Sequence, residues 1–241
     1  MDDLYTLLER AETNSDYRYV LERLRWFDGF QCPNCGWDQY YPIKTRGLRE
    51  CKQCGLQVSP TSGTFLHKAR NLRSWVRAIL FFLQKDELSS VSIAILFNRS
   101  YATAWFMMHK IRFVLGQSLD HVFSTEQREF SCSTMRAALF KASSGDVLMR
   151  SAAAVLSERD ADYRADFDFE DFVRLQYFLI SMLGVFQGVS RKYSQLYAFE
   201  FSLRRDRQLL DPLRLLGCFV RGSPLARSRL KQYLAPYMIR L

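Results

Sequence analysis

The feature that most constrains this chain is a pair of matching cysteine motifs. Cys32–Gly36 has the sequence Cys-Pro-Asn-Cys-Gly and Cys51–Gly55 has the sequence Cys-Lys-Gln-Cys-Gly, with only residues 37–50 between them. Each Cys-x-x-Cys turn brings two thiolates to one ion, and the glycine after it relieves the crowded backbone. A thioredoxin-like redox pair would instead have a single motif on a βαβ unit. We therefore predict a closed, structural Zn²⁺ site whose ligands are Cys32, Cys35, Cys51 and Cys54.

The spacing of apolar residues predicts helices on both sides of this cysteine region. Residues 2–27 follow helical spacing with a break at 14–16, whereas residues 28–63 contain Gly, Pro and short strand-like pieces at 40–43 and 56–58. Further helices are expected at 72–83, 88–97, 101–115, 134–142, 146–158, 169–187, 190–207, 212–220 and 224–235. The predicted fold is mainly α with a small β zinc ribbon, a helix-turn-helix and a helical C-terminal remnant.

These patterns suggest four regions. They are N-terminal helices (1–28), the zinc ribbon (29–66), a helix-turn-helix DNA-binding unit (67–117) and a helical C-terminal region (118–241).

The helix-turn-helix is predicted from two short amphipathic segments. Asn98 and Arg99 supply a turn between them, and Ser100 can cap the second helix. In such a motif the second helix enters the major groove with its N-terminal end first. The inward-facing residues are expected to be Val91, Ala94 and Ile95 on the first helix, and Ala104, Trp105, Met108 and Ile111 on the second.

Positive charge is concentrated around these motifs. The chain has 34 Lys+Arg against 25 Asp+Glu, a net charge of +9, and residues 32–115 contain 12 basic and 4 acidic residues. Such a field favours a polyphosphate partner, although a basic surface that only confers solubility would give the same count. We expect Ser100, Tyr101 and Thr103 near DNA bases and Arg99, Lys110 and Arg112 at phosphates. The full predicted DNA-binding set is Lys44, Arg46, Arg49, Arg99, Ser100, Tyr101, Thr103, Lys110 and Arg112.

The ends and the apolar runs of the chain predict a cytoplasmic, nucleoid-associated protein. The Met-Asp-Asp-Leu start has neither a charged n-region nor an apolar h-region, so no signal peptide is predicted. The longest apolar run, 175–189, is shorter than the roughly 20 residues of a membrane span, and paired cysteines suit a reducing compartment. A membrane partner is therefore not expected, and the sequence leaves open whether the protein is a homodimer.

Several blocks of sequence resemble the insertion-sequence transposases that couple an N-terminal zinc ribbon to a helix-turn-helix and a DDE, RNase-H-like nuclease. The similarity runs almost unbroken over 17–115 and resumes near the C-terminus in what looks like the family's closing helix. The blocks that carry it are 19–33, 44–46, 62–67, 101–112, 188–197 and 200–207. The resemblance implies binding to transposon-end-like duplex DNA.

The resemblance fails where the nuclease should be. It implies a first catalytic Asp on a strand just after the recognition helix, and the counterpart in Glu129–Thr134 has Cys132 at that position. A neutral thiol is a poor Mg²⁺ ligand. The last carboxylate corresponds to Glu170, but residues 133–169 are fewer than the roughly 60 that the intervening strands and helix need. The acids at 160–171 are more typical of a solvated loop.

We therefore predict a transposase-derived protein that binds double-stranded DNA sequence-specifically, without catalytic residues and without nuclease activity, as a regulator or a transposase remnant. Two alternatives stay open at this stage. One is an active DDE transposase with a divergent carboxylate set. The other is a ribbon that binds a protein partner.

Overall fold

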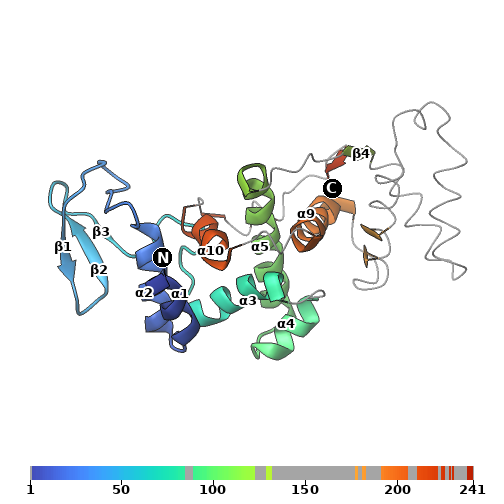
Figure 1. Cartoon of the computed structure of the whole chain (residues 1–241), viewed down its shortest axis with the longest axis horizontal. Coiled ribbons are helices and arrows are strands. Elements are labelled where there is room, and N and C mark those ends of the chain that lie inside the picture. Colours follow the sequence, from blue (N-terminus) through green and yellow to red (C-terminus); the bar gives the residue numbers. More distant parts are fainter. Residues whose placement is uncertain are drawn as a thin grey trace, which may run out of the picture.

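The chain is described by a computed structural model in which helices from both halves of the sequence pack against one central helix, α5 (Tyr101–Val122; Figure 1). The residues that the structure describes are 2–84, 89–122, 129–131, 177–178, 181–182, 191–205, 211–221, 224–225, 228, 230 and 238–240.

The N-terminal helices α1 (Asp2–Arg10) and α2 (Asn14–Arg25) are separated by a capping box. The Thr13 side chain accepts a hydrogen bond from the Asp16 N–H at 3.2 Å, and the Asp16 carboxylate accepts one from the Thr13 N–H at 2.8 Å. These bonds satisfy backbone groups that the start of a helix leaves unpaired. A break is present, but it lies at residues 11–13, and the predicted segment 14–16 forms the first turn of α2.

A three-stranded antiparallel sheet follows at one end of the molecule (Figure 1). Strands β1 (Tyr40–Ile43) and β3 (Gln57–Val58) match the predicted pieces, whereas β2 (Leu48–Cys51) lies between them and was not predicted. Its polar sequence, Leu-Arg-Glu-Cys, lacks the apolar alternation of an isolated strand. A small core of its own supports the sheet, made of Trp26, Phe30, Cys32, Cys51 and Val58, with Tyr40 against it.

Three helices form the middle of the chain. Helices α3 (Leu72–Gln84), α4 (Ser90–Leu96) and α5 (Tyr101–Val122) agree with the predicted segments, and α5 extends seven residues beyond the predicted end at 115. On α5, Ala104, Met108 and Ile111 are buried as predicted.

The C-terminal helices join the same core as the N-terminal ones. Helix α9 (Ser194–Arg205) follows a short 3-10 turn at Arg191–Tyr193 and packs along α5, while α10 (Pro212–Arg221) packs against α2, α3 and α5. Phe219 of α10 meets Phe65 with ring centroids 5.1 Å apart. One hydrophobic core therefore contains residues from α1 to α10, and helices far apart in the sequence lie side by side.

The region after residue 117, which was predicted to be mostly helical, contains two short strands besides its helices. Strands β4 (Glu129–Ser131) and β5 (Met238–Arg240) form a two-stranded antiparallel sheet in which Phe130 pairs with Ile239. A strand at 129–131 agrees with the resemblance, but β5 was not predicted by any pattern. The predicted helices at 134–142 and 146–158 lie outside the described residues.

The fold class is as predicted, mainly helical with a small three-stranded β ribbon. None of the helices within the described part of the chain has the length and hydrophobicity needed to cross a membrane. The four regions suggested by the sequence remain predictions.

Candidate metal centre and nucleic-acid interface

The two cysteine turns have the same backbone hydrogen bonds. In each turn the N–H of the first cysteine donates to the carbonyl five residues on, and the glycine N–H donates back to that cysteine's carbonyl. The four bonds are Cys32 to Trp37 (2.8 Å), Gly36 to Cys32 (2.9 Å), Cys51 to Leu56 (3.0 Å) and Gly55 to Cys51 (3.0 Å). Both glycines have positive φ, +76° and +69°, a conformation that costs glycine no Cβ strain.

The turns bring four sulfur atoms to one point. All four Sγ atoms lie within 4.8 Å of one another. The Cys32–Cys54 pair is at 3.6 Å and the Cys35–Cys51 pair at 3.5 Å. Zn–S bonds of about 2.3 Å would place tetrahedral ligands about 3.8 Å apart. The residues therefore fit a single thiolate-bound metal ion such as zinc.

The local environment has opposite effects on the second cysteines of the two turns, Cys54 and Cys35. A backbone hydrogen bond from Leu56 and a side-chain bond from Asn34 lower the pKa of Cys54 to about 6. The backbone of Trp37 acts on Cys35 in the same direction, but desolvation and the neighbouring thiols outweigh it and raise the pKa of Cys35 to about 12. A bound divalent cation would remove this difference between Cys54 and Cys35, because it stabilises all four thiolates at once.

Arg49 on β2 fastens the ribbon to α2. Its guanidinium lies 2.9 Å from the Glu22 carboxylate, and it stacks over the rings of Trp26 and Tyr40 at 4.0 and 4.2 Å from their centroids. Only 15% of the side chain is exposed. The prediction that Arg49 contacts DNA is wrong, because its charge is paired and its faces are covered.

The turn between β1 and β2 presents the ribbon's free cations. Lys44 and Arg46 are exposed there, as a DNA contact requires. The Arg46 carbonyl accepts a hydrogen bond from Arg18 of α2 at 3.5 Å, and the Arg46 side chain donates to Gln57 at 3.3 Å. Arg18, Lys44 and Arg46 therefore lie on one basic surface that spans α2 and the turn.

Helix α4 ends in a tight left-handed turn. Asn98 has φ +48°, and its N–H donates to the Ile95 carbonyl at 3.2 Å. The Arg99 N–H donates to the Ala94 carbonyl at 2.8 Å. This pair of bonds is a Schellman motif with asparagine as the left-handed residue. The predicted turn at Asn98 and Arg99 is present, and it changes the direction of the chain between α4 and α5.

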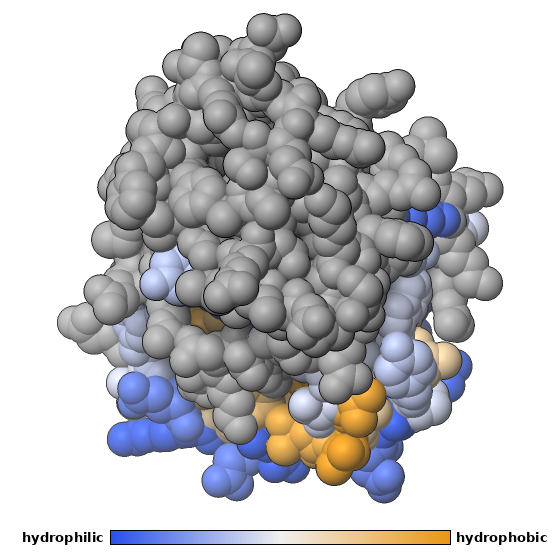
Figure 2. Space-filling view, turned by 90° about the vertical axis from the view of Figure 1, so that its right-hand side faces the viewer, coloured by the Kyte–Doolittle hydropathy of each residue, from blue (hydrophilic) through white to orange (hydrophobic). Residues whose placement is uncertain are grey.

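The buried face of α4 differs from the predicted one. Val91 and Ile95 are 54% and 77% exposed, whereas Ile93 is fully buried. The exposed side chains of Val91, Ile95 and Leu96 form an apolar surface. It lies at the lower edge of the molecule, where hydrophobic side chains gather in Figure 2. The predicted face was wrong because a helix of two turns fits several apolar stripes, and packing on α5 selects among them.

The N-terminal end of α5 is exposed and polar. Ser100 caps the helix, because its hydroxyl accepts a hydrogen bond from the Thr103 N–H at 3.3 Å. Arg99, Ser100 and Thr103 are exposed, and Tyr101 is 58% exposed. These four predicted DNA-binding residues therefore lie together on one accessible end of the helix.

Lys110 and Arg112, which were predicted to meet phosphates, are buried instead. They retain 6% and 0% exposure. The Lys110 ammonium donates to the Phe65 carbonyl at 2.6 Å and lies 4.4 and 5.3 Å from the ring centroids of Phe65 and Trp75. Arg112 is paired with Glu200 of α9. Their prediction as DNA contacts is wrong, since both charges point into the protein.

His109 lies in an aromatic cluster between α5 and the start of α9. Its ring stacks on Trp105 at 4.0 Å and meets the edges of Tyr193 and Tyr197 at 4.8 and 5.6 Å, between ring centroids. Burial, with the nearby charge of Arg112, lowers the pKa of His109 to about 3. This histidine is therefore a neutral core residue.

The positions implied for a nuclease, Cys132, Glu170 and the acids at 160–171, lie outside the described residues. Within the described part of the chain, the four-cysteine cluster is the one group with metal-ligand geometry.

Comparison with known families identifies the ribbon. Residues 13–57 match the family model of the transposase zinc-ribbon domain. The match begins at Thr13, the cap of α2, and ends at Gln57 in β3, so it spans the helix and sheet that Arg49 joins. Residues 13–57 are therefore similar to the zinc ribbon of transposases. No curated protein and no solved structure matches the chain.

The buried His109 predicts acid sensitivity. Its pKa is lowered from 6.5 to about 3 in the folded protein, so between these values the unfolded chain binds more protons. The free energy of unfolding therefore decreases as the pH is lowered from 6.5 towards 3. We expect His109→Phe to make the denaturant midpoint less dependent on pH between 6.5 and 3. His67→Phe, at an exposed histidine, is the control and should follow the parent. Parallel curves for parent and His109→Phe would contradict the assignment.

Proposed function

We propose that this protein is a transposase-derived, catalytically inactive protein that binds double-stranded DNA sequence-specifically, in the cytoplasm at the nucleoid. The observation that carries the proposal is the transposase zinc ribbon at residues 13–57. Two further features support it. The same core holds α4 and α5, joined by a tight turn, and the exposed end of α5 is lined with hydrogen-bonding and basic side chains.

In the proposed complex, the N-terminal end of α5 enters the major groove. Ser100, Tyr101 and Thr103 contact base edges, because their hydroxyl groups are exposed where the helix begins. Arg99 contacts phosphate beside them, and Lys44 and Arg46 contact phosphates from the ribbon turn. In this arrangement the ribbon turn contacts only the DNA backbone, whereas the start of α5 contacts the bases.

We propose that the metal is zinc and that its role is structural. Four thiolates fill a tetrahedral site and leave no position for water, so the ion holds the ribbon together and takes no part in chemistry. The small core around Trp26 is too limited to fold the ribbon alone, and metal binding would supply the remaining free energy.

The proposed lack of nuclease activity is supported by the sequence after α5. Cys132 stands where the resemblance expects a carboxylate, and a thiol does not replace a hard oxygen ligand for Mg²⁺. The distance along the chain from Cys132 to Glu170 is also shorter than the missing sheet requires.

An active DDE transposase is the second candidate, and one observation favours it. Strand β4 (Glu129–Ser131) forms where the resemblance expects the strand that carries the first carboxylate. Its partner is β5 at Met238–Arg240.

Removal of zinc ligands should unfold the ribbon. We expect the purified parent to contain one Zn²⁺ per chain and Cys51→Ser with Cys54→Ser to contain none, as measured by atomic emission. Cys218→Ser, outside the cluster, should retain the metal. Zinc that persists in the double variant, or is absent from the parent, would disprove the site.

Substitutions on α5 should separate affinity from specificity. Arg99→Ala should weaken binding to all duplexes about equally and reduce the salt slope of log K by about 1, because one phosphate contact is lost. Tyr101→Ala or Thr103→Ala should change the preferred sequence, as found by selection from a random duplex pool. If all three variants behave alike, α5 does not enter the groove as proposed. Weak salt dependence of the parent would instead favour a protein partner.

The protein should neither nick nor join DNA. The measurement is incubation of the selected duplex with Mg²⁺ or Mn²⁺, beside a Glu170→Gln variant. Cleavage by the parent that Glu170→Gln abolishes would establish the transposase instead, since it would show that this carboxylate serves a metal-dependent nuclease.

A further inference from the structure

Helix α5 is held along its buried length by α9, which begins 72 positions after the end of α5 at Val122. The two helices lie side by side in Figure 1. The contacts that join them include Arg112 with Glu200, His109 with Tyr197, and Gly116 with Phe199.

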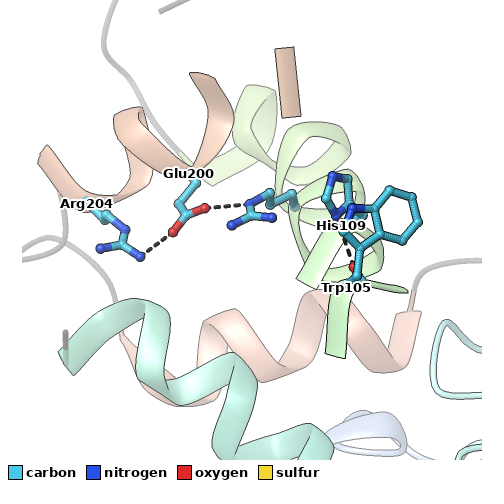
Figure 3. Close-up of polar contacts among 5 residues, drawn as sticks. Trp105, His109, Glu200 and Arg204 are labelled. Carbon is cyan, nitrogen blue, oxygen red and sulfur yellow. Dashed lines mark hydrogen bonds and ion pairs between the residues drawn. The ribbon is translucent and has the colours of Figure 1, made fainter. Parts of the chain in front are cut away.

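Glu200 is the charged centre of this contact. It is 1% exposed and accepts hydrogen bonds from Arg112 of α5 and from Arg204 one turn along α9 (Figure 3). Arg112 also lies over the Tyr197 ring, 3.9 Å from its centroid. A buried carboxylate is tolerated only when its charge is compensated, and removing it would leave two guanidinium groups without their counter-ion.

Gly116 allows the helices to approach closely. A Cβ at this position would lie 2.0 Å from Cε2 of Phe199, a separation that heavy atoms do not adopt. By contrast, a Cβ at Gly217 in α10 would meet nothing within 4 Å. A substitution at Gly116 therefore tests the α5–α9 contact, and the same substitution at Gly217 is a matched control in another helix.

Because α9 holds the buried part of α5, a small tilt at this contact would be amplified into a larger shift at the exposed end of α5. Tyr101 lies about 16 Å along the helix from Arg112, at 1.5 Å per residue, so a tilt of about 10° would move it by about 3 Å. Such a shift exceeds the tolerance of a hydrogen bond to a base edge.

We propose that Glu200 is a positioning residue for DNA recognition, and that α9 is an integral part of the DNA-binding unit. This inference rests on the proposed function, in which Ser100, Tyr101 and Thr103 read bases. It assigns a role in binding to the part of the chain where the resemblance implies only a closing helix of a lost nuclease.

The test compares the parent with Glu200→Gln in the full-length protein. Two quantities are measured: the affinity ratio between the selected duplex and a scrambled one, and amide hydrogen exchange along 101–116. We expect Glu200→Gln to lower the ratio at least tenfold and to speed exchange in α5. Binding to scrambled duplex and zinc content should stay near the parent's values. Glu9→Gln, the same change at an exposed site on α1, should match the parent throughout.

A steric pair gives an independent arm. Gly116→Ala should lower the affinity ratio, whereas Gly217→Ala should not. Adding Phe199→Ala to Gly116→Ala removes the clashing ring and should restore part of the ratio. A general loss of stability would not be rescued by a second truncation in the core.

The outcomes are distinct. The inference is overturned if exchange in α5 is unchanged in Glu200→Gln and Gly116→Ala, or if exchange rises while the affinity ratio stays at the parent's value. If the parent itself prefers no duplex, the proposed function fails. In that case the exchange data alone decide whether Glu200 positions α5.

Discussion

The fold depends on satisfying the cations that α5 carries into the core. Lys110 and Arg112 are both buried on this helix, and each has found a different partner, the Phe65 carbonyl and the Glu200 carboxylate. Burial lowers the pKa of Lys110 to about 8, so its ammonium is held at a desolvation cost that the carbonyl and the surrounding rings offset. Phe65 lies between β3 and α3, and Glu200 lies on α9. The two buried cations therefore connect α5 to both halves of the chain.

The sequence predicted well the features that are encoded locally. The cysteine turns need only residues within each motif and one further match at short range, so their spacing was sufficient to identify the cluster. Helices α3, α5, α9 and α10 show sustained helical spacing over ten or more residues, and their bounds were predicted within a few residues except for the C-terminal end of α5. Strands β2 and β5 were missed, because each is three or four residues long and is defined by its pairing partner.

The errors at the candidate interface have one physical cause. A basic residue in a sequence has the same formal charge whether it faces water or a distant carboxylate, and partners such as Glu22 for Arg49 and Glu200 for Arg112 are far away in the chain. A signal was nevertheless present for Arg112. It lies one turn after Met108 and beside Ile111, both on the predicted inner face of α5, so helical geometry already placed it near the core. Within the predicted DNA-binding set, the cations that are exposed lie at turns, and they are Lys44, Arg46 and Arg99.

The contact between α5 and α9 bears on the proposed loss of a nuclease. The two helices touch directly, through Glu200 and Phe199, so this contact does not pass through the sequence that connects them. Loop closure depends only weakly on length, about 0.6 kcal/mol for each doubling, so shortening a connection changes stability far less than breaking a buried ion pair. A shorter connection would leave the contact between α5 and α9 in place, whereas loss of α9 would expose the buried face of α5. Under the proposed function, the C-terminal helices would persist because DNA binding, not cleavage, depends on them.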